Sequence, residues 1–184
     1  MEAAINMKIK NPEGGRLAES FDFIYDRYHK NVYNYIAFRI NNQYDAEELS
    51  NDVFVKAMRS HKSYNTDFAI EAWLIGIAKN VVTDYLRKTM RRQFVPLDSI
   101  RGLFSHSRQP EEVIVFNEEI KGLIKAMTAL RDKERQILSM KFATGLKQRE
   151  IAEILNISES NVKVTAHRAL NKLKKHMEED SRDK

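Results

Sequence analysis

The chain has 184 residues, with 31 Lys or Arg against 26 Asp or Glu, which gives a formal net charge of +5. It contains no cysteine, so disulfides, thiolate metal sites and cysteine nucleophiles are excluded. No apolar run is long enough to span a membrane, and the first residues lack the apolar segment of a secretory signal. We therefore expect a globular protein in the cytoplasm, with no direct membrane insertion.

Apolar residues recur at helical spacing through most of the chain, and no strand-like alternation persists, which predicts an all-α fold. We expect residues 1–16, which contain the turn sequence NPEGG, to form a flexible N-terminus. Residues 17–92 then contain three predicted helices, the first up to about Ile40, the second from Asp45 and the third from about Ile70. These helices predict one small helical domain.

The second predicted helix has an apolar stripe that we expect to face the core: Leu49, Val53, Val55 and Met58. The third, FAIEAWLIGIAKNVVTDYLRKTMRR, has a core face and a polar face of Asn80, Asp84, Arg87, Lys88 and Arg91. The stretch Lys79–Arg92 holds five cations and one acid, so this polar face is suited to follow a nucleic-acid backbone. Taken alone, the same pattern also fits an ordinary solvated helix face.

Residues 93–110 contain two of the three prolines and no sustained periodicity, so we predict a flexible linker there. Helical periodicity returns over residues 111–177, with breaks near Arg131 and Gly145, and predicts a second small helical domain. Residues 178–184 are expected to form a solvated tail. The chain as a whole is therefore predicted to consist of two small helical domains joined by a flexible linker.

The sequence REIAEILNISESNVKVTAHRALNKLKKHM, from Arg149 to Met177, predicts two helices that meet at a turn. Asn156 lies at the turn, where a left-handed backbone favours Gly and, after Gly, Asn. Ser158 is a good N-cap for the second helix. The apolar residues that such a helix-turn-helix must bury follow helical steps: Ile151, Ala152, Leu155, Ile157, Val162, Ala166, Ala169 and Leu173.

The second helix of this motif is basic, because the stretch Glu159–His176 holds five cations and one acid. The major groove of B-DNA, about 12 Å wide, admits one helix. We expect the N-terminal end of the helix to face base edges and the following turns to reach phosphates. The expected base-facing residues are Ser160, Asn161, Lys163 and Val164, and the expected phosphate-facing residues are Arg168 and Lys172. A helical hairpin inside a bundle is the alternative.

Two parts of the chain resemble a known family. YDAEELSNDVFVKAM followed by FAIEAWLIGIAKNVVTDYLRK resembles region 2 of bacterial RNA polymerase sigma factors of the sigma-70 family. ALRDKERQILSMKFATGLKQREIAEILNISESNVKVTAHRALNKLKKHM resembles region 4 of the same family. The resemblance covers about residues 17–177, and the form with regions 2 and 4 alone is similar to the extracytoplasmic-function group.

The resemblance implies three groups of binding residues, matched position by position. Core RNA polymerase is expected to dock on an acidic helix: Asp45, Glu47, Glu48, Asn51 and Asp52. The melted −10 strand is expected to contact a loop with a stacking ring, and the polar face after it: Tyr64, Asn65, Thr66, Asp67, Asn80, Arg87, Lys88 and Arg91. The −35 duplex is expected to contact the helix-turn-helix: Arg149, Ser160, Asn161, Lys163, Val164, Thr165, Arg168 and Lys172.

Three positions qualify this resemblance. Trp73 matches the tryptophan of the family's AWL sequence, and its apolar neighbourhood favours a core role over that of a wedge in DNA. Val164 and Thr165 stand where the family often has Ser and Arg. Without that Arg, more of the −35 affinity is expected to rest on Lys163 and Arg168.

The resemblance implies a sigma factor, the specificity subunit of RNA polymerase, without catalytic residues, cofactor or metal of its own. The implied partners are core RNA polymerase, promoter DNA and an anti-sigma factor, with no small-molecule substrate. A standalone helix-turn-helix regulator with an N-terminal sensor or dimerisation domain is a second hypothesis, and it would bind duplex DNA without polymerase. A helical enzyme is disfavoured, because the five histidines are scattered and HExxH, GxSxG and a phosphate-binding Gly loop are missing.

Overall fold

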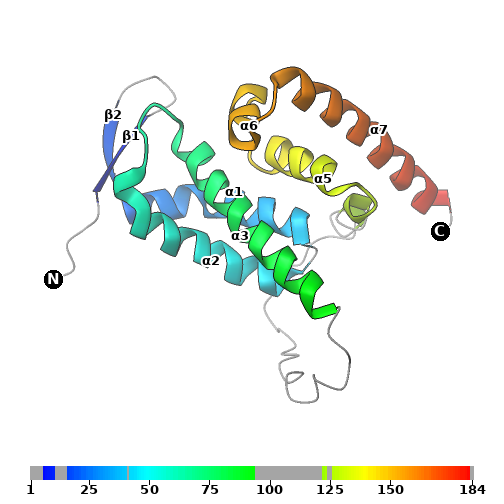
Figure 1. Cartoon of the computed structure of the whole chain (residues 1–184), viewed down its shortest axis with the longest axis horizontal. Coiled ribbons are helices and arrows are strands. Elements are labelled where there is room, and N and C mark those ends of the chain that lie inside the picture. Colours follow the sequence, from blue (N-terminus) through cyan, green and yellow to red (C-terminus); the bar gives the residue numbers. More distant parts are fainter. Residues whose placement is uncertain (1–5, 11–15, 41, 94–121, 124–125, 183–184) are drawn as a thin grey trace, which may run out of the picture.

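The computed structural model describes residues 6–10, 16–40, 42–93, 122–123 and 126–182. Helices dominate these residues, which confirms the predicted all-α class (Figure 1). Two units can be followed along the chain, and a two-stranded hairpin precedes the first of them.

Three long helices form the N-terminal unit: α1 (Phe21–Ile40), α2 (Gln43–Ser60) and α3 (Ile70–Gln93). Each packs against the other two, and the 3-10 turn η1 (His61–Ser63) leads from α2 into the loop before α3. α2 begins after Asn42, whose side chain accepts hydrogen bonds from the backbone N–H groups of Tyr44 and Asp45. The bundle buries mainly large apolar side chains: Ile24, Val32, Tyr35, Ile36, Val53, Phe54, Leu74, Ile75 and Val82.

A short β-hairpin lies before α1, so the expectation of a flexible N-terminus over residues 1–16 is wrong for part of that range. β1 (Asn6–Lys10) pairs antiparallel with β2 (Arg16–Ser20), with Lys8 opposite Ala18 at the centre. In β1, apolar and polar residues alternate with the period of a strand. Five residues are too few for that alternation to stand out in a sequence that is otherwise helical.

Four elements form the C-terminal unit: α5 (Asp132–Leu138), the π-helical turn η3 (Ser139–Ala143), α6 (Gln148–Leu155) and α7 (Glu159–Arg182). The predicted breaks are confirmed, because Arg131 is the N-cap of α5 and Gly145 has a φ of 74°. Glycine adopts that left-handed conformation without the steric cost of a Cβ atom. The core of this unit is again apolar: Ile137, Leu138, Met140, Ile151, Val162, Ala166 and Ala169.

α7 continues to Arg182, so the prediction of a tail from residue 178 is wrong. No Gly or Pro interrupts the sequence there, and Lys174 Nζ lies 3.7 Å from Glu178 Oε1, four residues on. The predicted linker, residues 93–110, lies outside the described residues except for Gln93, which ends α3.

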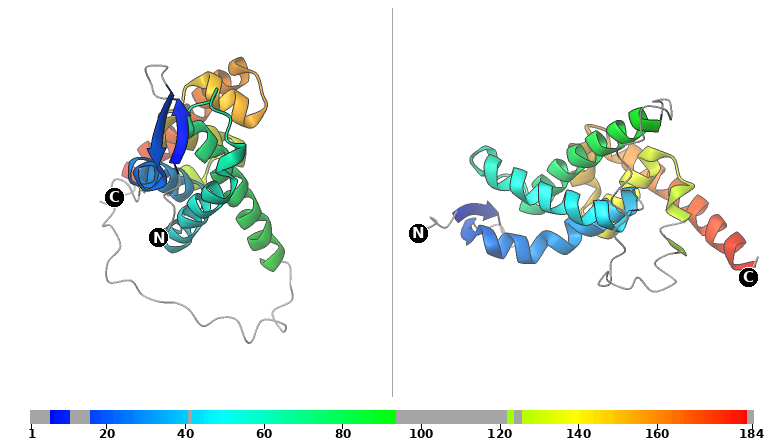
Figure 2. Two further views of the ribbon diagram at one scale, coloured as in Figure 1. Left: turned by 90° about the vertical axis from the view of Figure 1, so that its left-hand side faces the viewer. Right: turned by 90° about the horizontal axis from the view of Figure 1, so that it is seen from below.

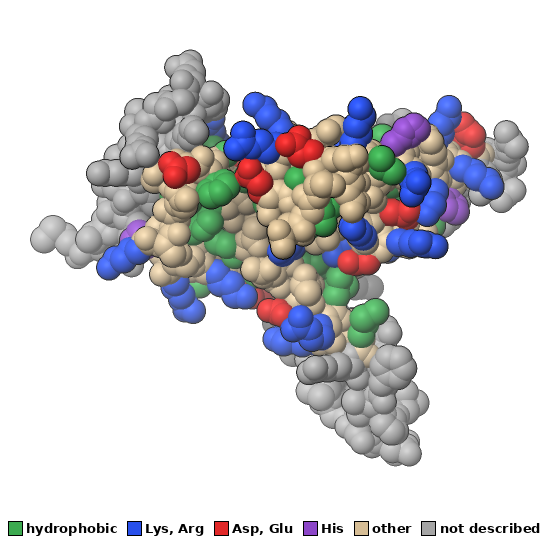
Figure 3. Space-filling view, turned by 45° about the horizontal axis from the view of Figure 1, so that its top comes forward, with side chains coloured by type: hydrophobic (Ala, Val, Ile, Leu, Met, Phe, Trp, Pro, Cys, Tyr) green, Lys and Arg blue, Asp and Glu red, His purple; other side chains and the backbone are tan. Residues whose placement is uncertain are grey.

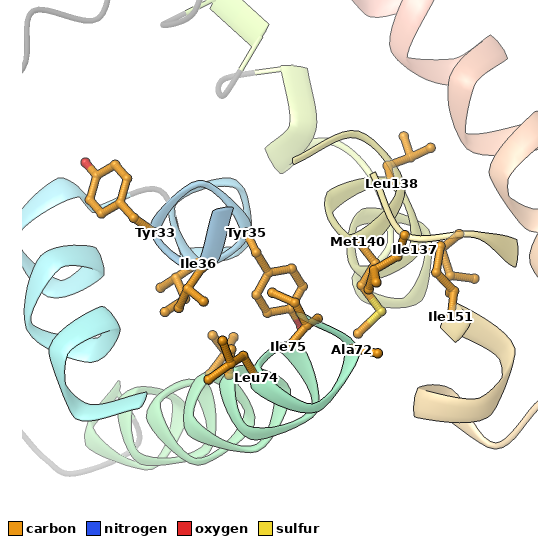
Figure 4. Close-up of a cluster of buried hydrophobic side chains, with 14 of the residues drawn as sticks. Tyr33, Tyr35, Ile36, Ala72, Leu74, Ile75, Ile137, Leu138, Met140 and Ile151 are labelled. Carbon is orange, nitrogen blue, oxygen red and sulfur yellow. The ribbon is translucent and has the colours of Figure 1, made fainter. Parts of the chain in front are cut away.

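The two units pack against each other, with α1 on η3 and α3 on α6 (Figure 2). Buried apolar side chains form a continuous cluster across the boundary, where Tyr35 and Ile75 of the first unit lie toward Met140 of the second (Figure 4). Arg39, at the end of α1, is 1% exposed, and its guanidinium donates a hydrogen bond of 2.7 Å to Asp132 Oδ1 on α5.

Candidate nucleic-acid interface

The turn of the helix-turn-helix has the geometry that the sequence predicts. Asn156 ends α6 in the left-handed region, with φ 51° and ψ 51°. The Ile157 N–H then donates to the Ala152 carbonyl at 3.0 Å. Ser158 Oγ accepts a hydrogen bond of 3.2 Å from the Asn161 N–H and so caps the start of α7. These local bonds set the direction in which α7 leaves the turn.

α7 buries one side and exposes the other. Buried side chains at the expected positions are Ile151, Ala152, Val162, Ala166, Ala169 and Leu173, while Leu155 and Ile157 are half-buried. Thr165 is half-buried too, and its hydroxyl donates to Asn161 Oδ1 at 3.1 Å. The other predicted −35 residues are exposed: Arg149, Ser160, Asn161, Lys163, Val164, Arg168 and Lys172.

The exposed side of α7 includes residues that the sequence reasoning left out of the DNA-binding set. His167, Asn171 and Lys175 follow Val164 at helical steps, and all three side chains are exposed. Lys, Arg and His side chains crowd the right-hand end of Figure 3, where α7 lies. The helical spacing from Val164 was the signal that could have identified these three positions.

The loop between α2 and α3 is ordered by its own polar groups. Tyr64 is 8% exposed, its hydroxyl donates to the Phe68 carbonyl at 2.6 Å, and its ring centroid lies 5.0 Å from that of Trp73. Asn65 Oδ1 accepts a hydrogen bond of 2.9 Å from the Asp67 N–H, and both of these residues are exposed. The ring of Tyr64 therefore does not offer an open stacking surface in this arrangement, contrary to its expected role.

A cavity of about 490 Å³ lies beside this loop. Asn65, Asn80 and Phe68 line it, and Phe68 is 44% exposed, so it supplies the accessible ring in this loop. Trp73 is half-buried: it packs against the core, as expected, and also lines the cavity. Thr66, in the same loop, is half-buried.

The polar face of α3 continues beyond the cavity. Arg87 and Lys88 are exposed, as predicted. Arg87 Nη1 lies 3.1 Å from Asp84 Oδ1, so Asp84 pairs with Arg87. Arg91 belongs to α3, but its side chain is outside the described part of the structure.

The predicted polymerase-binding residues of α2 fall on two faces. Asp45, Glu48 and Asp52 line a groove of about 490 Å³ between α2 and α3. α3 lines it as well, with Asp84, Lys88 and Tyr85, whose hydroxyl donates to Asp45 Oδ2. The groove therefore holds four carboxylates and two lysines, Lys56 and Lys88, and this excess of carboxylates suits a cationic partner.

The remaining two residues of that set lie toward α1. Glu47 Oε1 lies 3.6 Å from His29 Nε2, and Asn51 Oδ1 accepts a hydrogen bond of 3.1 Å from the Tyr25 hydroxyl. The structure therefore brings three of the five together and separates Glu47 and Asn51 from them.

Two residues assigned to the core stripe of α2 are in fact exposed. Val55 and Met58 are each 38% exposed, and Tyr44 is 45% exposed on the same helix. The core side of α2 is formed instead by smaller residues and one aromatic ring: Ala46, Ser50, Val53, Phe54 and Ala57.

Sequence comparison gives the same two regions. The family model for sigma-70 region 2 matches residues 24–92, and that for sigma-70 region 4 matches residues 120–173. The RNA polymerase sigma factor YlaC of Bacillus subtilis is 31% identical over 160 residues, which cover 86% of this chain and 92% of YlaC. The chain belongs to the sigma-70 family. The ECF RNA polymerase sigma factor SigX of Bacillus subtilis is 29% identical over 172 residues, which cover 88% of this sigma factor and 86% of SigX.

A solved structure has the same fold as this sigma factor. The co-crystal structure of the sigma factor RpoE in complex with the anti-sigma factor NepR from Bartonella quintana matches with a TM-score of 0.70 and 20% identity, over 86% of this chain and 96% of that chain. As a member of the extracytoplasmic-function type, the chain is a specificity subunit of RNA polymerase and directs promoter-specific transcription initiation. In the parts that the structure describes, no helix is long and apolar enough to cross a membrane.

Two of the charged −35 residues predicted for this sigma factor have partners within the chain. Lys172 Nζ donates to Glu134 Oε1 at 2.6 Å and so braces α7 against α5. That hydrogen bond, assisted by one of 3.0 Å from the Arg131 N–H, lowers the pKa of the Glu134 carboxyl. Arg149 is also paired, with its Nε 3.0 Å from Glu153 Oε1, although its side chain remains 78% exposed.

Proposed function

We propose that this sigma factor divides promoter recognition between its two units. α7 enters the major groove of the −35 duplex, while the loop before α3 and the polar face of α3 capture the melted −10 strand. The exposed N-terminal end of α7 is the observation that carries this proposal. The left-handed turn at Asn156 and the cap at Ser158 direct that end away from the core of the unit.

Capture of the −10 strand needs a stacking surface and hydrogen-bonding groups close together. Phe68 supplies an exposed ring beside the amides of Asn65 and Asn80. A base stacked on an aromatic ring gains about 1–3 kcal/mol. That energy traps DNA that has opened transiently, provided that the polymerase holds both units in register on the promoter. The chemistry of RNA synthesis belongs to the polymerase.

The Lys163→Ala variant tests the role of α7. The ammonium of Lys163 is exposed at the N-terminal end of the helix, and its loss is expected to weaken −35-dependent transcription by roughly 1–3 kcal/mol of binding free energy. The measurement is multiple-round transcription with core polymerase on a promoter with its −35 element and on one with that element scrambled. Lys174→Ala is the matched control, because Lys174 is exposed further along α7. Equal losses on both promoters would contradict the assigned role.

The acidic groove of α2 is proposed to dock on core polymerase. Glu48→Lys reverses a charge between Asp45 and Asp52 and is expected to weaken core binding about tenfold or more, since like charges across an interface are repelled. Affinity is measured by titrating labelled sigma factor with core polymerase at two salt concentrations. Glu178→Lys, which reverses an exposed charge at the far end of α7, is the control. Unchanged affinity of the Glu48 variant would remove this groove from the interface.

We also propose that an anti-sigma factor regulates this chain in the cytoplasm. The support is that the RpoE structure with the same fold is a complex with the anti-sigma factor NepR. Affinity purification of the tagged sigma factor from the organism that encodes it would identify such a partner by co-purification.

A further inference from the structure

We infer that Thr165 is a positioning residue for −35 recognition: its hydroxyl fixes the amide of Asn161, so that this side chain meets the DNA as a hydrogen-bond donor. The inference rests on the proposed entry of α7 into the major groove of the −35 duplex. It moves Thr165 from the set of residues that contact DNA to a supporting position behind them, and it states which base chemistry Asn161 reads.

Thr165 lies at the edge between the buried and the exposed side of α7. Ala166, the next residue, is 2% exposed, whereas Thr165 is half-buried and Asn161, one turn earlier, is exposed. Within a helix, a Thr hydroxyl can bond the backbone carbonyl of the residue four positions back. Here the hydroxyl donates instead to the side-chain oxygen of that residue, Asn161 Oδ1, at 3.1 Å. Thr165 is therefore placed to orient its neighbour.

Asn161 is held at two points. Its backbone N–H donates to Ser158 Oγ at 3.2 Å, and its side-chain oxygen accepts from the Thr165 hydroxyl. An Asn amide has one oxygen that accepts hydrogen bonds and one nitrogen that donates them. Because Oδ1 is turned toward Thr165, Nδ2 is the end left for DNA, and it has no hydrogen-bond partner among the described residues.

An amide fixed in this way selects among base edges. In the major groove, N7 of both purines, O6 of guanine and O4 of thymine are acceptors, whereas cytosine presents the N4 donor. The outward amide nitrogen can donate to any of these acceptors, but it places a donor against the donor of cytosine. One hydrogen bond changes affinity by about threefold to tenfold. Cytosine should therefore be disfavoured by that factor at the base that Asn161 faces.

The other expected base-facing residues lack such a support. Ser160, Lys163 and Val164 are exposed like Asn161, and in the described structure none of the three has a side-chain polar group held by another side chain. The ammonium of Lys163 is carried on a flexible stem. A group that is ordered before binding loses less entropy in the complex. Asn161 is therefore expected to contribute more base selectivity than Lys163.

Two variants separate the hydroxyl of Thr165 from the shape of its side chain. Thr165→Val replaces the hydroxyl with a methyl group, and Thr165→Ser keeps the hydroxyl. Parent and variant sigma factors are each assembled with core polymerase and mixed with promoters whose −35 element is randomised. The promoters recovered in heparin-resistant complexes are sequenced, which gives the base preference at each position. Asn161→Ala identifies the position that Asn161 reads, because the preference should vanish there.

The expected result is specific to that one position. In the parent, cytosine should be depleted there by about threefold to tenfold. In Thr165→Val the amide is free to turn over and to accept from cytosine N4, so the depletion should disappear while the other positions keep their preferences. Thr165→Ser should retain the parent profile, since it retains the donor. Circular dichroism confirms that each variant is folded.

Several results would overturn the inference. They are enrichment of cytosine in the parent at that position, no position changed by Asn161→Ala, an unchanged profile in Thr165→Val, or the same loss in Thr165→Ser. A uniform loss over all sequences in Thr165→Val would also overturn it, because contacts to phosphates carry no sequence information. A parent profile without any base preference in the −35 element would instead contradict the proposed −35 role of α7 itself.

Discussion

Replacing Ile151 with alanine is expected to lower the free energy of unfolding of the C-terminal unit by about 2–5 kcal/mol. Ile151 is 0% exposed and packs in the core between α6 and its neighbours (Figure 4). The truncation removes buried apolar area and leaves a cavity, because the short helix α6 is fixed at its end by the Asn156 turn and has little freedom to collapse inward. Loss of −35-dependent transcription should follow the loss of stability.

Urea unfolding monitored by circular dichroism measures this effect. Val164→Ala is the matched control, because Val164 is 44% exposed on α7 and its truncation should change stability by no more than about 0.5 kcal/mol. Similar losses in both variants would show that Ile151 is not part of a packed core.

Glu134→Gln is expected to have the second largest effect. The Glu134 carboxylate, 11% exposed, accepts the Lys172 ammonium at 2.6 Å and the Arg131 N–H at 3.0 Å. A charge-assisted hydrogen bond contributes about 1.5–3 kcal/mol. The Lys172 side chain is 45% exposed, so solvent screening reduces the expected loss to about 1–2 kcal/mol.

The effect should depend on pH. The Lys172 hydrogen bond holds the pKa of the Glu134 carboxyl below its ordinary value of 4.5. The ionised carboxylate therefore stabilises the fold fully above that ordinary pKa, and this contribution is lost as the pH falls through the lowered pKa of the folded chain. The stability difference between parent and Glu134→Gln should be large at pH 7 and shrink toward pH 3. A difference that stays constant over this range would contradict the assignment.

The helix-turn-helix is the part of the fold that local sequence predicts best. Asn156 and Ser158 act through bonds to residues within five positions, and the buried side of α7 repeats at helical steps. Such features are visible in a short window of sequence. β1 was not predicted, because five alternating residues carry little information. The core stripe predicted for α2 was wrong at Val55 and Met58, which are exposed.

The sequence alone could not show which partners the individual side chains contact. Arg39 and Asp132 are 93 positions apart, and Lys172 and Glu134 are 38 apart, so no local pattern connects them. Tyr64 has the ring that a base pocket needs, yet its burial against Trp73 depends on how the loop closes on α3. Residue type predicted the chemistry of these sites, while tertiary contacts decided which groups are open.

The most direct measurement is of binding to purified core RNA polymerase and to promoter DNA, by native gel and by permanganate footprinting of the −10 element. We predict a stoichiometric complex with core, opening of the −10 element by that complex alone, and little duplex binding by the sigma factor without core. Saturable, sequence-specific duplex binding by the isolated chain, with no core complex, would contradict the division of promoter recognition proposed here and would favour a standalone helix-turn-helix regulator.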